Sequence, residues 1–146
     1  MGKRQEDTGR IGRLLNLSYA QWQARTYDRL AQAGFGDIRP AHSPVFRNVG
    51  PEGTRIVDLA ALASMTKQSM SYLVEDLQKL GYVTLEPDPD DGRAKRVCFT
   101  PRGMEAETTL AAISTSLEAD LEKLVGKEAV NRLRAALESI VSDPGL

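Results

Sequence analysis

Two helix-forming segments separated by only three residues are the feature that most constrains this chain. Residues 56–63 have a helical composition, and Ser64, Met65 and Thr66 form a short break after them. The next segment, residues 67–80, carries apolar residues at helical spacing. Thr66 is suited to cap this second helix, and Gly81 to end it in the left-handed conformation. The pattern predicts a helix-turn-helix.

A β-hairpin is predicted directly after the helix-turn-helix. Residues 82–86 and 95–99 alternate between apolar and polar types, and residues 87–94 between them are rich in Asp, Pro and Gly. Such alternation on both sides of a turn-rich loop is typical of two antiparallel strands. Thr100 followed by Pro101 then predicts the start of another helix.

Long amphipathic segments lie on both sides of this central part. Residues 10–33 carry one apolar stripe, and residues 104–142 carry two, divided by Gly126. A small helix-turn-helix cannot cover all of this apolar surface, so we expect these segments to pack against a second copy of the chain. The alternative is that they pack only on each other. The expected fold is one mainly α-helical domain over residues 1–146 with a small β-hairpin wing.

Composition and charge exclude several other classes. The chain has 146 residues, of which 41% are hydrophobic and 27% charged, as in one ordinary soluble domain. No apolar run approaches the roughly 20 residues of a membrane span. Residues 1–9 are polar and do not resemble a secretion signal, and the single cysteine excludes an internal disulfide. We therefore expect a cytoplasmic protein with no membrane partner.

The charges are unevenly distributed along the chain. The formal net charge is −1, but residues 1–50 carry +4, residues 51–103 carry −1 and residues 104–146 carry −4. An anionic partner should therefore meet the chain away from its C-terminal segment. Random scatter of charge over a solvated surface is the alternative interpretation.

The sequence contains no recognisable catalytic motif. His42 and Cys98 are each the only residue of their kind, and no phosphate loop, nucleophile elbow or zinc-protease motif is present. The acidic loop that begins at Asp88 has the wrong spacing for calcium, because Phe99 stands where a bidentate Glu would be needed. We expect no enzymatic activity, no metal and no cofactor.

The helix-turn-helix and the hairpin supply candidate DNA-binding residues. The second helix of such a motif can enter the major groove, and a hairpin tip can enter the minor groove. Solvated charged surfaces are the alternative in both places. Asp91 is placed to form a salt bridge with Arg93 in the wing. The candidates are Lys67, Gln68, Ser69, Ser71 and Tyr72 on the helix, and Arg93, Lys95 and Arg96 on the hairpin.

Residues 54–103 resemble the winged helix-turn-helix of the MarR family of bacterial transcriptional regulators. The matching pieces are residues 59–63, 65–71, 77–83, 88–97 and 100–103, among which the wing pattern of 88–97 is the most specific. The resemblance implies a homodimer, held by the helices of residues 10–33 and 104–142, on a roughly palindromic double-stranded DNA operator. It implies that Lys67 to Tyr72 contact the major groove and that Arg93 enters the minor groove. Tyr72 stands where many relatives carry Arg, and Gly92 interrupts the usual wing pattern, which implies fewer phosphate contacts.

The resemblance also implies a response to a small aromatic or amphipathic ligand near the junction of the dimer and DNA-binding regions. Simple core packing of Trp22 and Phe46 is the alternative. Cys98 lies in the hairpin and not in the first helix, where thiol-sensing relatives keep their reactive cysteine, so we expect it to be buried and inert. The candidate ligand-binding residues are Tyr19, Trp22, Tyr27, His42, Phe46 and Arg47.

Two functions are compatible with these features. The first is a sequence-specific DNA-binding transcriptional regulator, with repression by blocking polymerase as the default. The second is a winged-helix adaptor that binds proteins and not DNA. The near-neutral charge of residues 51–103 favours the adaptor, and the cations Arg93, Lys95 and Arg96 favour DNA.

Overall fold

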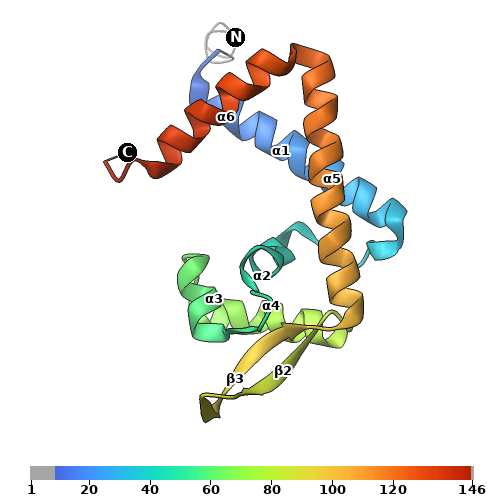
Figure 1. The fold of residues 1–146 in the computed structure, drawn as a ribbon, viewed down its shortest axis with the longest axis vertical. Coiled ribbons are helices and arrows are strands. Elements are labelled where there is room, and N and C mark those ends of the chain that lie inside the picture. The colour runs from blue at the N-terminus through green and yellow to red at the C-terminus, as the bar shows by residue number, and fades with distance from the viewer. Residues whose placement is uncertain (1–8, 146) are drawn as a thin grey trace, which may run out of the picture.

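The computed structural model describes residues 9–145, in which one long helix joins a lower lobe to an upper pair of helices (Figure 1). The expectation for the polar N-terminus falls mostly on residues 1–8 and so lies outside the described part. The mainly α-helical fold with a small β wing is confirmed. The helices are α1 (Ile11–Leu30), α2 (Ser43–Asn48), α3 (Ile56–Leu62), α4 (Lys67–Lys79), α5 (Pro101–Val125) and α6 (Lys127–Ser142), and the strands are β1 (Thr54–Arg55), β2 (Val83–Asp88) and β3 (Asp91–Phe99).

The predicted helix-turn-helix is present and its ends are fixed by the expected residues. The hydroxyl oxygen of Thr66 accepts a hydrogen bond from the Ser69 N–H at 3.1 Å and so caps α4. Gly81 follows α4 with a φ of 88°, a left-handed conformation that favours glycine. Met70 and Val74 are buried and hold α4 against the rest of the lobe.

The wing is part of a three-stranded antiparallel sheet with the order β1-β3-β2. The two residues of β1 pair with Val97 and Arg96 of β3. The sequence does not predict β1, because two residues carry no detectable alternation. The predicted loop of residues 87–94 is too long, since β2 extends to Asp88 and β3 begins at Asp91. The turn is tightened by Asp88, whose carboxylate accepts the Asp90 N–H at 2.9 Å.

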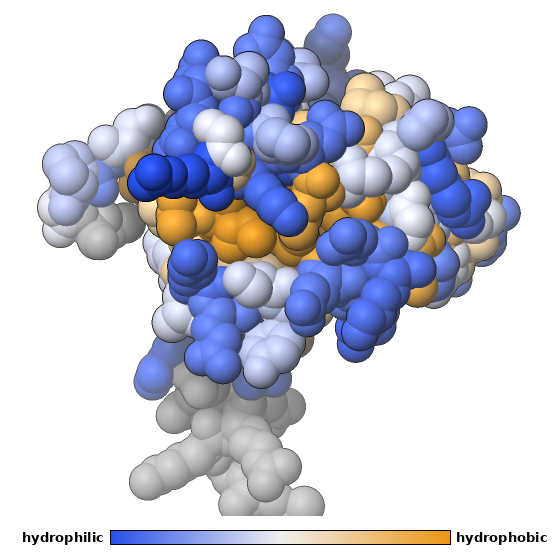
Figure 2. Space-filling view, turned by 90° about the horizontal axis from the view of Figure 1, so that it is seen from below, coloured by the Kyte–Doolittle hydropathy of each residue, from blue (hydrophilic) through white to orange (hydrophobic). Residues whose placement is uncertain are grey.

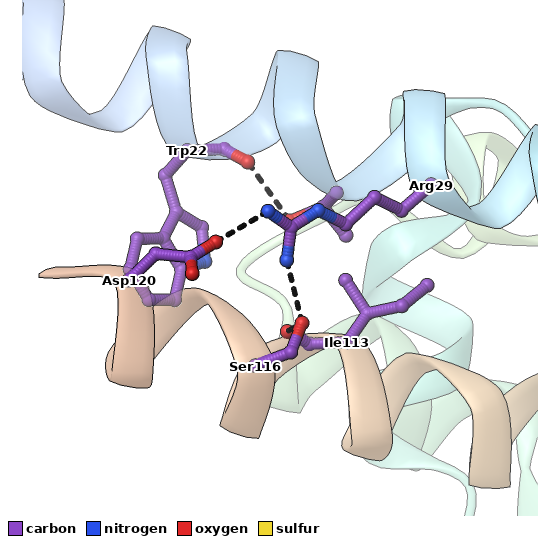
Figure 3. Close-up of polar contacts among 6 residues, drawn as sticks. Trp22, Arg29, Ile113, Ser116 and Asp120 are labelled. Carbon is purple, nitrogen blue, oxygen red and sulfur yellow. Dashed lines mark hydrogen bonds and ion pairs between the residues drawn. The ribbon is translucent and has the colours of Figure 1, made fainter.

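The hydrophobic core lies in the lower lobe. Its fully buried side chains come from the helix-turn-helix, the sheet and the segments that border them, and they include Leu30, Val45, Leu59, Met70, Leu77, Tyr82 and Val97. Above this lobe, polar contacts join α1 to α5 (Figure 3). The Arg29 guanidinium donates to the Ser116 hydroxyl at 2.6 Å and forms an ion pair with Asp120. These contacts join α1 to α5 where the two helices cross.

The upper helices have no comparable core. Every residue from Ile11 to Ala20 is exposed, and so is every residue of α6 after Val130. Viewed from below, with the lower lobe nearest the viewer, the molecule also shows some hydrophobic surface bordered by hydrophilic residues (Figure 2). None of the described helices is long and apolar enough to cross a membrane. The exposed large apolar side chains of the upper helices are Ile11, Leu14, Leu15 and Leu17 on α1, Leu124 and Val125 on α5, and Leu133, Leu137, Ile140 and Val141 on α6.

The start of α5 approaches the end of the helix-turn-helix so closely that only glycine fits there. A Cβ atom on Gly103 would lie 2.0 Å from the carbonyl oxygen of Tyr82 and 3.0 Å from the Phe99 ring. We predict that Gly103→Ala lowers the free energy of unfolding by about 1–3 kcal/mol, because backbone must move to relieve the overlap. Urea unfolding followed by circular dichroism measures this. Gly12→Ala is the control, since the space around that helical glycine is open; equal stability of the two variants would contradict the close approach.

Candidate nucleic-acid interface

The first two turns of α4 present a polar surface to solvent. Lys67, Gln68, Ser69 and Tyr72 are exposed and Ser71 is half-buried. The first carboxylate of the helix is Glu75, and the N-terminal end of a helix carries a partial positive charge. Four of the five candidate residues are exposed and Ser71 is less accessible, whereas the contact of all five with DNA stays a prediction.

The three candidate cations of the wing do not share one face. Lys95 stands opposite Pro87 and Arg96 opposite Glu86 in the β2–β3 ladder. Neighbouring residues of a strand point to opposite faces, so Lys95 lies on the side of the buried Val97 and Arg96 on the other. Arg93 and Lys95 are exposed, while Arg96 is half-buried. Arg93 and Lys95 are therefore more accessible to a partner than Arg96.

The predicted salt bridge of Asp91 is replaced by a different contact. The Asp91 carboxylate accepts the backbone N–H of Arg93 at 3.1 Å, a local turn interaction that leaves the guanidinium out. The ion pair at this end of the sheet is formed instead by Arg55 Nε and Asp88 Oδ2, at 2.6 Å. The N–H of Asp90 and the Arg55 guanidinium hold the pKa of Asp88 below its usual value. Sequence reasoning missed Arg55, because its partner is 33 residues away and β1 has no signal of its own.

A second polar network ties α4 to the 3-10 turn Pro40–His42, which precedes α2. His42 is fully buried, and its Nδ1 accepts the Arg39 N–H at 2.9 Å. Its Nε2 therefore carries the proton and donates to Asp76 Oδ2 at 2.6 Å. The Arg39 guanidinium donates to the same Asp76 oxygen at 2.8 Å. The bonds from His42 and Arg39 lower the pKa of Asp76, a residue of α4.

The candidate ligand-binding residues lie in different surroundings. Phe46 is 6% exposed and stacks on Phe99, with 5.6 Å between the ring centroids. His42 has both ring nitrogens occupied, as described above. Trp22 and Tyr27 are half-buried at the edge of the core, while Tyr19 and Arg47 are exposed. A ligand contact by these residues stays a prediction.

Two surface hollows are lined by other side chains. One of about 290 Å³ is lined by Arg39, Tyr72, Leu73, Glu75, Asp76 and Lys79. Another of about 470 Å³ is lined by Phe35, Met104, Glu105, Thr108 and Thr109. Neither includes a residue that the sequence predicts to bind a ligand.

Cys98 lies on the outer face of the sheet and is half-buried. Burial raises the pKa of its thiol, and the neighbouring Glu86 carboxylate raises it further. A raised pKa lowers the fraction of reactive thiolate, which supports the expectation of an unreactive side chain, but Cys98 is half-buried and not buried as expected.

A helix-turn-helix followed by a β-hairpin, with polar and cationic side chains on both, defines a winged helix-turn-helix protein. The model of the MarR family matches residues 37–94, which hold the helix-turn-helix and most of the wing. Over this segment the chain is similar to the MarR family, and the predicted resemblance is confirmed. No curated protein matches the sequence at a significant level.

Solved structures of transcriptional regulators share this fold over nearly the whole chain. The DNA-bound structure of the transcriptional repressor CouR has a TM-score of 0.75 and 18% identity, over 92% of this chain and 97% of that one. CouR from Rhodococcus jostii bound to p-coumaroyl-CoA has a TM-score of 0.72 and 23% identity, over 92% and 94%. Apo MarR from E. coli has a TM-score of 0.71 and 20% identity, over 90% and 96%. At these identities the likeness shows the fold.

The lowered pKa of Asp76 predicts a specific dependence of stability on pH. A carboxyl group whose pKa is lower in the folded state stabilises the fold above its unfolded pKa, and this contribution is lost as pH falls through the folded value. We predict that Asp76→Asn is less stable than the wild type at pH 7 and that the difference shrinks towards pH 3. Urea unfolding at a series of pH values measures it. Glu75→Gln, a change on the same helix, is the control; a pH-independent difference for Asp76→Asn would refute the charge interaction.

Proposed function

We propose that this protein is a sequence-specific, double-stranded DNA-binding transcriptional regulator that acts as a homodimer on a roughly palindromic operator. The observation that supports the proposal is that two accessible surfaces lie in the same lobe. One is the carboxylate-free start of α4, and the other is the wing with exposed Arg93 and Lys95. In such a module the helix contacts base edges in the major groove and the wing contacts the minor groove.

The residues of α4 are suited to different contacts with DNA. Gln68 can pair with adenine through two hydrogen bonds, and Lys67 can reach guanine or a phosphate. Ser69 lies beside the capped helix end, where its hydroxyl accepts a hydrogen bond from Thr66 at 2.8 Å. Ser71 and Tyr72 offer hydroxyl groups to phosphates or bases. Arg93 is the wing residue proposed to enter the minor groove, with Lys95 on nearby phosphate.

The dimer is proposed from the uncovered apolar faces of the upper helices. Side chains such as Ile11, at 74% exposed, and Leu137, at 38%, would be costly to leave in water in such number. A second copy that covers them would hold two α4 helices at a fixed separation. Two successive major grooves on one side of B-DNA are about 34 Å apart, and the dimer must match this spacing.

Regulation is proposed to follow from that spacing. The dimer is proposed to repress transcription by blocking polymerase. A small aromatic or amphipathic ligand that favours another separation of the two α4 helices would weaken operator binding and so relieve the repression. CouR, which shares the fold, is bound to p-coumaroyl-CoA in one structure and to DNA in another. Because His42 and Phe46 have partners within the fold, the candidates with accessible surface are Tyr19, Trp22, Tyr27 and Arg47.

A salt titration of binding to duplex DNA tests the proposed function. We predict that the logarithm of the affinity falls linearly with the logarithm of the salt concentration, by about 0.9 for each phosphate contacted. Arg93→Ala should weaken binding about tenfold or more, because the wing loses its groove contact. Arg132→Ala removes an exposed cation of α6 and should leave the affinity unchanged. An absence of binding even at low salt would favour a protein-binding adaptor.

A charge placed on α6 tests the proposed dimer. We predict that Leu137→Glu converts the dimer to a monomer and weakens operator binding strongly, because the carboxylate would have to be buried without a partner. Sedimentation equilibrium measures the mass. Leu62→Glu on α3, where the leucine is 63% exposed, is the control and should remain a dimer. A wild-type monomer at micromolar concentration would argue against the dimer itself.

A further inference from the structure

We propose that Arg55 and Asp88 are positioning residues whose ion pair fixes the direction in which the wing projects from the helix-turn-helix. This inference rests on the proposed function, because it states how the wing is aimed at DNA. Neither residue has to touch DNA to do so.

The backbone alone holds the wing weakly at its outer end. Strand β1 pairs with β3 only at Val97 and Arg96, so beyond that point the wing is a two-stranded hairpin. Isolated hairpins are marginally stable in water. The β2–β3 register also shifts between Pro87 and Asp88, where the regular ladder ends. The outer wing therefore needs a further contact to keep its direction.

The Arg55–Asp88 ion pair lies at the point where the regular pairing of β2 with β3 ends. Arg55 is the last residue of β1 and directly precedes α3, so its backbone is held on both sides. Its Nε donates to Asp88 Oδ2 at 2.6 Å, across the sheet from the helix-turn-helix to the end of β2. The other carboxylate oxygen of Asp88 accepts the Asp90 N–H at 2.9 Å. One carboxylate thus connects the start of α3 with the turn at the wing tip.

Partial burial makes this contact stronger than an ordinary surface ion pair. The Asp88 side chain is 12% exposed and that of Arg55 is 37% exposed. The Cα partner of Arg55 in β3 is Arg96, whose Nε is buried and has no hydrogen-bond partner among the described residues. The ion pair of Arg55 with Asp88 thus connects β1 to β2 across the central strand β3.

The direction in which Asp88→Asn changes the affinity for DNA shows whether Asp88 positions the wing or acts only as a negative charge. Asp88, Asp90 and Asp91 all lie at the tip of a wing that is proposed to approach phosphates. If Asp88 acted only as a negative charge, Asp88→Asn would tighten DNA binding by removing repulsion. If Asp88 positions the wing, the same change weakens binding although the protein becomes less negative.

The experiment compares Asp88→Asn with Asp90→Asn in the full-length protein. Both remove one negative charge from the wing tip, and both keep an oxygen and the local backbone bonds. We expect Asp88→Asn to weaken binding to the wild-type operator or a genomic duplex about fivefold to tenfold, because one charge-assisted contact is lost. We expect Asp90→Asn to bind the same DNA as well as the wild type or better. Equal or tighter binding by Asp88→Asn would overturn the inference, while salt-dependent binding by the wild type would leave the proposed function intact.

The double variant Asp88→Asn with Arg93→Ala shows whether Asp88 acts through the wing. Once Arg93 is absent, the wing keeps only the Lys95 contact, so its direction matters less and adding Asp88→Asn should cause a smaller loss than in the wild-type background. A loss of the same size in both backgrounds would overturn the inference.

Hydrogen exchange of the wing amides in the protein without DNA provides a second readout. We expect faster exchange around residues 86–96 in Asp88→Asn and in Arg55→Gln than in the wild type and in Asp90→Asn. Unchanged protection in the variants of the pair would overturn the inference. Because this measurement needs no DNA, it tests the inference separately from the proposed function. If Asp88→Asn fails to fold, Arg55→Gln tests the ion pair in its place.

Discussion

The structure depends on the packing of Tyr82, the fully buried residue at the junction between α4, the sheet and α5. Its ring lies between Phe35 and Phe46, its carbonyl accepts the Thr100 N–H at 3.0 Å, and its hydroxyl donates to Asp37. Burial raises its pKa to about 12, with the Asp37 carboxylate adding to the shift. Because Gly103 packs directly on the Tyr82 carbonyl, α5 cannot tilt without disturbing α4. In the proposed dimer, a change in the upper helices would therefore reach α4, the helix proposed to contact DNA, through α5.

Much of the fold could be predicted because its signals are local. Thr66 and Thr100 cap helices, Gly81 ends one, and the alternation of residues 82–86 and 95–99 specifies two strands, all within a few residues. The errors arise where partners are far apart in the sequence. The His42–Asp76 and Arg55–Asp88 contacts join residues separated by 34 and 33 positions, and neither pairing has a periodic pattern. The expected Asp91–Arg93 salt bridge failed for the opposite reason, because a two-residue separation favours the backbone N–H over the longer guanidinium.

The ion pairs also explain how a segment of nearly neutral charge can present a surface to an anion. Residues 51–103 carry a formal charge of −1, which by itself argues against DNA. Two of their carboxylates are occupied, however: Asp76 by His42 and Arg39, and Asp88 by Arg55. Among the described residues, Lys67, Arg93 and Lys95 form no ion pair and stay exposed. The charge that a phosphate would meet therefore depends on which carboxylates are already paired, and the pairing places the unpaired cations at the start of α4 and on the wing.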